Sequence, residues 1–397
     1  MKRIIALALA LVLCIGALAS CGSGGEKNYA ENNTKIKIGI SGPLTGDAAV
    51  YGVAVKNSIQ LAIDEINANG GLDGIMFELA MTDDKHNPTL IAANYASLYE
   101  SGMQISLGTV TTAPGLEWKE LSKDDNVFVL TPSATGDDIP EYDNAFQMCF
   151  ADSNQGKVSA EVFNETYADK KVGIFYKSDD EYSVGIRDQF VANLSQGLKD
   201  GLKQASFKGT ESDFATQANE LKDCDVIFLP IYVAPASQFM TACKANGNTK
   251  VSVYYGCDGL DGIDNIDGFD VSTIPQEISY LSHFVSTATT GAAADFIKKY
   301  NDKYDEDKEP LNQFGAAAYD CVYAIYEALK FAKKNGAKFD ETTPASEYCE
   351  ILTEVFNDKD FVFHGITGAP TSTGKSDISW KADGTVNKTP VSYTVAK

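Results

Sequence analysis

The sequence predicts an α/β protein built from two doubly wound parallel-sheet lobes. Short runs rich in β-branched residues alternate with amphipathic helical stretches from residue 35 onward, which is typical of α/β folds. These runs are continuously apolar, as expected of strands that helices cover on both faces. The chain has 397 residues, more than one ordinary hydrophobic core accommodates, so we expect two lobes.

The first βα unit shows this alternation most clearly. The apolar run 35–40 leads into the loop "SGPLTG", and a helix follows in which Ile59, Ile63 and Ile66 fall at helical spacing. Further strands are predicted at residues 76–81, 104–108, 126–131, 171–176, 225–230 and 250–256.

The chain is expected to cross between the lobes three times, near residues 146–156, 278–286 and 361–368. Helices without a fresh set of strands follow the second crossing. We therefore predict a three-segment hinge joining a first lobe of residues 35–150 plus 286–362 to a second lobe of residues 151–285 plus 363–397. In the tail, Asp383 and Gly384 stand between β-rich runs, which indicates a hairpin.

The N-terminus has the features of an export signal. Lys2 and Arg3 precede an apolar run too short for a membrane span, and small residues then lead to Cys21. Residues 1–20 resemble a bacterial lipoprotein signal, which implies that Cys21 carries lipid and becomes the mature N-terminus. The alternative is an ordinary cleaved signal with an incidental cysteine. Residues 21–34 are expected to form a flexible tether, and the protein to lie on the extracytoplasmic face of the cell membrane.

The net charge limits the partners that the protein can have. The chain holds 33 Lys and Arg against 55 Asp and Glu, a formal charge of −22. Such a field repels phosphate backbones and anionic lipid surfaces. We therefore expect no nucleic-acid binding, and a membrane link through the anchor only.

Enzyme and metal signatures are scarce. His86, His283 and His364 have no second ligand at metal spacing and are interpreted as polar surface or loop residues. No serine lies in a nucleophile-elbow pattern. The aspartates that recur between residues 258 and 270 do not match a calcium loop, and most are interpreted as solvated turn residues. We expect no catalysis, no cofactor and no metal.

The cysteines beyond Cys21 show no pairing pattern. An exported chain permits disulfides, but small buried thiols are equally consistent with their apolar surroundings. The six residues concerned are Cys149, Cys224, Cys243, Cys257, Cys321 and Cys349.

Hydroxyl-rich loops follow the first, third and fourth predicted strands: "SGPLTG", "TVTTAPG" and "TPSATG". In an open parallel sheet such loops gather at one crevice, and each also begins a helix whose free N–H groups favour an anion. Together they predict a carboxylate site on the first lobe. The alternative, for any single Ser or Thr, is that it caps its own helix.

The same strand-end positions in the second lobe hold Tyr182, Tyr232 and Asp258. A carboxylate with aromatic rings suits a primary ammonium group, through charge-assisted hydrogen bonds and cation–π contacts. A carboxylate site on one lobe and an ammonium site on the other describe an α-amino acid. The alternative for each tyrosine is core packing.

These patterns make residues 35–392 similar to the leucine/isoleucine/valine-binding family of solute-binding proteins for ABC importers, which have the type I periplasmic-binding fold. The resemblance rests on "IKIGISGPLTGDAAVYG", "AIDEINANGGLDG", "LAMTDDKHNP", "LTPSAT", "FADSNQG", "DVIFLPIY" and "YYGCDG". It implies that Thr112, Ser133 and Thr135 bind the ligand carboxylate. It also implies that Tyr182, Tyr232 and Asp258 surround the amine, that Tyr51 and Phe314 line the side-chain pocket, and that Asp152 belongs to the hinge motif.

The sequence departs from this family in two places. Where the family often has a disulfide, His86 and Thr111 stand here, and Asp258 replaces the commoner glutamate. The resemblance implies a lipid-anchored binding protein that delivers a branched-chain or another small aliphatic amino acid to permease and ATPase subunits. Two alternatives stay open: an amide, urea or aromatic acid as the ligand, or a ligand sensor that feeds a signalling receptor.

Overall fold

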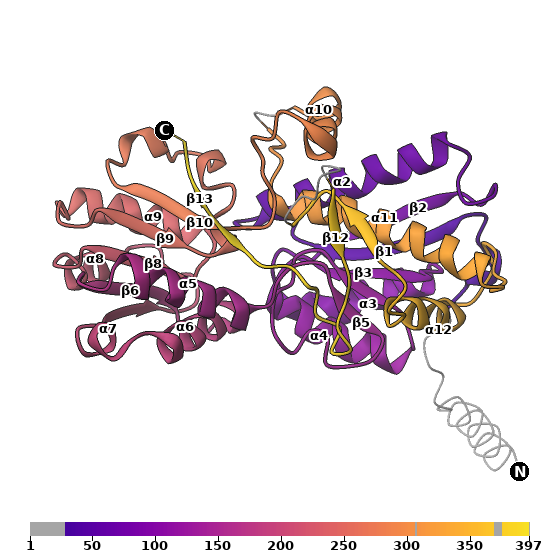
Figure 1. The fold of residues 1–397 in the computed structure, drawn as a ribbon, viewed down its shortest axis with the longest axis horizontal. Helices are drawn as coiled ribbons and strands as arrows, with labels where there is room; N and C mark the ends of the chain where they lie inside the picture. Colours follow the sequence, from indigo (N-terminus) through magenta and orange to yellow (C-terminus); the bar gives the residue numbers. More distant parts are fainter. Residues whose placement is uncertain (1–27, 306–307, 369–374, 397) are drawn as a thin grey trace, which may run out of the picture.

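Two separate parallel sheets, one in each lobe, organise the molecule (Figure 1). The computed structural model describes residues 28–305, 308–368 and 375–396. The predicted signal peptide, Cys21 and residues 22–27 of the predicted tether lie outside these residues. The rest of the predicted tether, residues 28–34, includes a short 3-10 helix (Ala30–Asn32), and the Asn28 amide donates to the Met103 carbonyl.

The first lobe holds a five-stranded parallel sheet with the order β2-β1-β3-β4-β5. Its strands are β1 (Ile36–Gly42), β2 (Phe77–Asp83), β3 (Ile105–Thr109), β4 (Val129–Thr131) and β5 (Ala145–Gln147). The helices of this lobe are α2 (Ala49–Ala68), α3 (Ile91–Glu100), α4 (Thr112–Asp124), α10 (Gly291–Lys303), α11 (Gln313–Lys334) and α12 (Ala345–Phe356). α2 packs on α11 and α3 on α4, and these pairs contribute to separate hydrophobic cores, so helices cover both faces of the sheet.

The second lobe repeats this order as β7-β6-β8-β9-β10 and adds β13 as an antiparallel edge strand. Its strands are β6 (Val172–Lys177), β7 (Lys203–Phe207), β8 (Val226–Leu229), β9 (Val253–Gly256), β10 (Glu277–Ser282) and β13 (Val391–Thr394). Its helices are α5 (Asp152–Thr166), α6 (Glu181–Asn193), α7 (Gln196–Asp200), α8 (Ala215–Glu220) and α9 (Val233–Ala245). The predicted fold class is thus confirmed. In both sheets the strand order reverses at one point, and a ligand crevice is expected at the carboxyl ends of the strands there.

The C-terminal tail contributes to both parts of the molecule. β11 (Phe363–Gly365) and β12 (Ser376–Ile378) form a small antiparallel sheet, in which β11 lies beside α11. The chain then runs across to β13 on the second sheet (Figure 1).

A buried polar cluster joins this tail to the segments between the sheets. Asp320 on α11 accepts hydrogen bonds from the N–H groups of Ile366 and Thr367, both 2.9 Å, and from the Thr367 hydroxyl at 2.5 Å. Lys388 donates to the Met148 carbonyl at 2.8 Å and to the Thr367 hydroxyl. Because Gly368 also donates to the His283 carbonyl, all three inter-sheet segments meet at this cluster.

Candidate functional site

The predicted carboxylate-binding hydroxyls lie at the carboxyl ends of β3 and β4. Thr112 begins α4, while Ser133 and Thr135 lie in the loop after β4. All three side chains are buried, and the hydroxyl oxygens of Thr112 and Thr135 are 3.5 Å apart. The strand ends therefore bring these hydroxyls together, as the sheet topology predicts.

Helix capping does not account for these hydroxyls. The N-cap residue of α4 is Thr111, and its side chain makes no capping hydrogen bond. Thr131 has the structural role in the second loop: its hydroxyl donates to the Thr109 carbonyl and accepts from the Ala134 N–H. In the part of the chain that the structure describes, no group bonds to the Ser133 hydroxyl, so it is available to a ligand.

The second lobe supplies two stacked tyrosines and a carboxylate. Tyr182 lies in the first turn of α6, Tyr232 is the N-cap of α9, and Asp258 follows β9. The rings of Tyr182 and Tyr232 stack with centroids 4.6 Å apart. The Tyr182 hydroxyl donates to Asp258 at 2.7 Å and accepts from the Gly259 N–H at 2.9 Å, which fixes the carboxylate against the ring.

Tyr51 and Phe314 approach from the first lobe. Each lies in the first turn of its helix, α2 or α11, and their rings meet edge to face with centroids 5.2 Å apart. The Tyr51 hydroxyl donates to the Gly259 carbonyl at 2.6 Å and accepts from the Val233 N–H at 2.9 Å. Tyr51 therefore bonds directly to the second lobe.

These side chains surround one small cavity of about 10 Å³, room for roughly one water molecule. The lining residues are Tyr51, Val110, Thr111, Ser133, Thr135, Tyr182, Tyr232, Asp258, Gly259 and Phe314. Two further predicted site residues lie just behind this lining: Thr112 contacts Thr135, and Asp152 accepts a hydrogen bond from the Thr135 hydroxyl. The structure thus brings together all nine side chains that the resemblance implies.

The cavity is acidic, and no cation lines it beside its carboxyls. Burial raises the pKa of Asp258 to about 7, although the Tyr182 hydroxyl opposes the shift. Burial also raises the pKa of Asp152 well above its usual value, against the hydrogen bond from Thr135. The lining contains no Lys, Arg or His, and neither carboxyl forms an ion pair with any described residue. Because a buried charge needs a partner, the cavity favours a ligand that brings a cation.

His86 takes part in the surroundings of this cavity, which the sequence interpretation did not foresee. Its Nδ1 lies 2.9 Å from the Thr111 hydroxyl, so a hydrogen bond joins the two positions where the similar family often has a disulfide. Its ring packs edge to face on Tyr232, with centroids 5.0 Å apart, and its Nε2 lies 4.0 Å from Asp180. Burial lowers the pKa of His86 to about 4, which keeps the imidazole neutral between the lobes.

Other features were also missed by sequence reasoning. His283 lies in the loop after β10, within the predicted alternatives, but it is buried, whereas His364 is exposed and pairs with Asp377. Gly259 contributes backbone groups to the cavity, and a Cβ there would lie 2.5 Å from the Tyr182 hydroxyl. The "CDG" stretch was a possible signal for this close approach, because glycine often marks a site where another group comes near the backbone.

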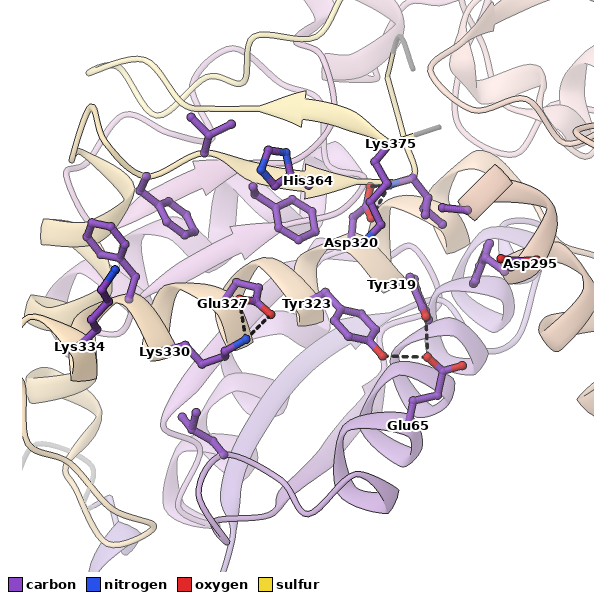
Figure 2. A pocket seen from close by; sticks show the side chains of 18 of the residues that line it. Glu65, Asp295, Tyr319, Asp320, Tyr323, Glu327, Lys330, Lys334, His364 and Lys375 are labelled. Atoms are coloured by element: carbon purple, nitrogen blue, oxygen red, sulfur yellow. Dashed lines mark hydrogen bonds and ion pairs between the residues drawn. The ribbon is translucent and has the colours of Figure 1, made fainter. Parts of the chain in front are cut away.

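A much wider hollow lies on the first lobe between α11 and β11 (Figure 2). Its volume is about 1130 Å³, and several of its polar groups are paired with one another. Glu65 accepts from the hydroxyls of Tyr319 and Tyr323 at 2.5 and 2.8 Å and pairs with Lys299 at 2.8 Å. This hollow is open and far from the strand ends, so the small cavity is the candidate site.

Among the described residues, no cluster of His, Cys, Asp and Glu could hold a metal ion, and no helix is sufficiently long and apolar to span a membrane. The six cysteines from Cys149 to Cys349 are all buried and unpaired.

Comparison with known proteins identifies the family to which the chain belongs. A family model described as periplasmic binding protein matches residues 35–360. The Leu/Ile/Val-binding protein BraC3 of Rhizobium johnstonii is 25% identical over 351 residues, which cover 87% of this chain and 92% of that protein.

Solved structures share the two-lobed architecture. The branched-chain amino acid transporter substrate-binding protein LivJ of Streptococcus pneumoniae, solved with isoleucine, is 26% identical with a TM-score of 0.70, covering 91% of this chain and 99% of that one. A solute-binding protein from R. palustris, solved with 4-hydroxybenzoate, has a TM-score of 0.75 at 17% identity, covering 91% and 93%. The second likeness shows the fold alone.

Proposed function

Because the chain belongs to the periplasmic binding protein family, we propose that it is an extracytoplasmic solute-binding lipoprotein of an ABC importer that captures an α-amino acid. The amino acid is held between the two lobes, and the closed form is presented to a membrane permease with its ATPase subunits. Of the similar proteins named above, BraC3 is named for leucine, isoleucine and valine, and LivJ is described as a branched-chain amino acid transporter substrate-binding protein.

The observation that carries this proposal is the buried, uncompensated carboxyl of Asp258. An α-ammonium group placed beside it gains a charge-assisted hydrogen bond and lies close to the stacked rings of Tyr182 and Tyr232. The ligand carboxylate then faces the hydroxyls of Ser133 and Thr135 on the other lobe. Each lobe binds one end of the zwitterion, so binding favours closure.

The same observation disfavours the other ligand classes. An aromatic acid would add a negative charge to a cavity that already holds one carboxyl and is lined by no Lys or Arg. A neutral amide or urea brings no cation, so it offers Asp258 no charge-assisted hydrogen bond. The apolar walls provided by Tyr51 and Phe314 instead suit an aliphatic side chain, branched or smaller.

A thermal-shift screen of the purified protein tests this proposal. The panel comprises the twenty amino acids, small amides, urea, benzoate and 4-hydroxybenzoate. A ligand at a hundredfold excess over its dissociation constant adds about 2.7 kcal/mol of stability, which gives an easily measured shift. Stabilisation by benzoates or amides, with none by any amino acid, would contradict the proposal.

The anchoring part of the proposal rests on Cys21 and has its own test. The acidic chain is not expected to bind anionic lipid by itself, so we expect Cys21→Ala to move the protein from the membrane to the soluble fraction. Cell fractionation with immunoblotting measures this change, and amino-acid binding by the released protein serves as the control for folding. Protein that stays on the membrane and still binds would rule out the lipid anchor.

A further inference from the structure

The loop that carries Ser133 and Thr135 does not lead into a helix, although the sequence predicted one. β4 ends at Thr131, turns follow, and the next strand is β5. The free N–H groups of a helix N-terminus are therefore not available to hold this loop or its ligand. Other contacts must keep Ser133 and Thr135 in place.

Three consecutive carbonyls of this loop accept hydrogen bonds from the first segment that runs between the two sheets. The carbonyls of Ala134 and Gly136 both accept from the side-chain amide of Gln147, at 3.0 Å each. The Thr135 carbonyl between them accepts from the Asp152 N–H at 2.8 Å. Gln147, the last residue of β5, therefore holds the backbone on both sides of Thr135 in the chain.

These bonds fix the orientation of the Thr135 peptide group. A trans peptide bond points its N–H away from its C=O, so the Thr135 N–H points away from Gln147 when the Ala134 carbonyl points toward it. Within the described residues no acceptor binds this N–H, and Thr135 lines the cavity. The loop can thus offer a ligand carboxylate the Thr135 N–H as well as the Ser133 hydroxyl.

Gln147 is itself held in place and is polar at a cost. Its N–H donates to the Gly384 carbonyl at 3.0 Å, and its carbonyl accepts from the Trp380 indole at 2.8 Å. The side chain is fully buried, and its Oε1 has no hydrogen-bond partner among the described residues. An unpaired buried acceptor carries a desolvation penalty, which a methionine of similar size would avoid. The two donors of the amide therefore account for a glutamine at this position.

We infer that Gln147 is a positioning residue for the carboxylate end of the ligand; the inference rests on the proposed function. Its amide holds the Ala134 and Gly136 carbonyls, and through them the Thr135 peptide group, in the orientation that a carboxylate needs. Without these donors, the Ala134 carbonyl keeps only the Cys149 thiol at 3.5 Å, which is a weak donor. The loop would then take up other orientations, and ligand binding would have to restore the ordered one.

Titration calorimetry of Gln147→Met tests this role, because the change keeps the size of the side chain and removes both donors. L-Leucine, L-valine and L-alanine are each compared with their primary amides, which keep the ammonium group and the side chain but lack the carboxylate. Weak ligands are measured by competition. We expect affinity for the best amino acid to fall by roughly tenfold, and affinity for its amide by less than about threefold. An equal loss for both ligands, or no loss for the amino acid, would overturn the role of Gln147.

Asn144 provides a matched control at the opposite end of the same two strands. Its buried side-chain amide donates to the Val127 carbonyl at 2.7 Å, and both residues precede their strands. Asn144→Leu should lower the melting temperature, as Gln147→Met does, but leave the ratio of amino-acid to amide affinity unchanged. A similar change of ratio in Asn144→Leu would show a general loosening of the lobe and would overturn the specific role.

A second variant keeps the inference testable if Gln147→Met does not fold. The amide of Gln147→Asn is one methylene too short to reach both carbonyls, so the same selective loss for the amino acid is expected. An unchanged ratio in this variant would overturn the inference and leave the proposed function standing. A parent protein that binds none of the amino acids would overturn the proposed function itself.

Discussion

Asp258 in the cavity and Asp320 on α11 are equally buried, at 2% and 1% exposure, yet their surroundings differ in charge. Asp320 lies near Lys388, to which it is linked through the Thr367 hydroxyl. Asp258 has tyrosine and backbone partners but forms no ion pair with any described residue. The chain provides a cation for one carboxyl and leaves the other for a ligand.

The pKa values of Asp320 and Lys388 show that burial disfavours the charged form of both groups, although each lies near an opposite charge. Burial lowers the pKa of Lys388 to about 8, and it raises that of Asp320 despite the attraction of Lys388. Desolvation therefore exceeds the mutual attraction for both groups, as is common for buried ion pairs. Such a pair is retained where it satisfies several backbone groups, as Asp320 does at Ile366 and Thr367. The Asp258 carboxyl also has hydrogen-bond partners, the Tyr182 hydroxyl, the Gln155 amide and the Gly259 N–H, but none of them is a cation.

The largest expected effect is on ligand affinity in Asp258→Asn. The change keeps the size of the side chain but removes its charge, which leaves the ligand ammonium buried without a counter-ion, at a cost of about 3 to 5 kcal/mol. That is roughly two to four decades of affinity, measured by titration calorimetry. Asp264→Asn, an exposed aspartate of the same loop, is the matched control and should change binding by less than about 0.5 kcal/mol.

A folded Asp258→Asn protein that binds its amino acid within threefold of the parent would contradict the proposed difference between Asp258 and Asp320. Asp258 would then be a structural carboxyl like Asp320, and the amide and aromatic-acid ligands would gain support. Circular dichroism confirms that the variant is folded.

The second largest expected effect is on stability, and it tests the role of Lys388 beside Asp320. Lys388→Met leaves Asp320 buried without its cation, and we expect the free energy of unfolding to fall by about 3 to 5 kcal/mol. Chemical denaturation measures this loss, and adding Asp320→Asn should restore part of it. Lys381→Met, an exposed lysine of the same tail, should have an effect within about 0.5 kcal/mol. A loss of affinity without a loss of stability in Lys388→Met would show that the two carboxyls do not have separate roles.

Much of the fold was predictable because continuous apolar runs in the sequence mark the strands. The seven predicted strands are confirmed as β1, β2, β3, β4, β6, β8 and β9. β7 was missed because three of its five residues are exposed at the sheet edge, so it lacks a continuous apolar run. The turn at Asp383 forms, with a bridge between Trp380 and Val386, but the flanking strands do not pair with each other. β12 joins β11 and β13 joins β10, since a turn signal specifies local geometry and not tertiary partners.

The candidate site was likewise predictable only in part. The hydroxyls of the first lobe and Tyr182, Tyr232 and Asp258 of the second were predictable because they follow strands, where topology brings them together. Tyr51, Phe314 and Asp152 were expected only from the family resemblance. The contacts of the Tyr51 hydroxyl were not predictable, because they involve backbone groups of Val233 and Gly259 that no residue type encodes. The approach of Lys388 to Asp320 likewise joins positions far apart in the chain, and only the folded tail brings them close.

The smallest effect, a pH dependence, follows from the pKa of Asp258 near 7. Because this pKa exceeds the unfolded value, Asp258 contributes stability at low pH that is lost as pH rises from about 4 through 7. An ammonium ligand instead needs the ionised carboxylate, so binding releases a proton and affinity falls on acidification. We expect a decrease of roughly twentyfold between pH 7.5 and 5.5, measured by calorimetry.

Asp258→Asn provides the control for this profile. It removes the titrating carboxyl but keeps Asp180 and Asp261, whose pKa values burial raises to about 6. If Asp258 is responsible, the variant binds weakly but with nearly constant affinity across this range. A parent protein with constant affinity from pH 5.5 to 7.5 would mean that no proton leaves on binding. The cavity carboxyl would then already be ionised without a ligand, contrary to its raised pKa.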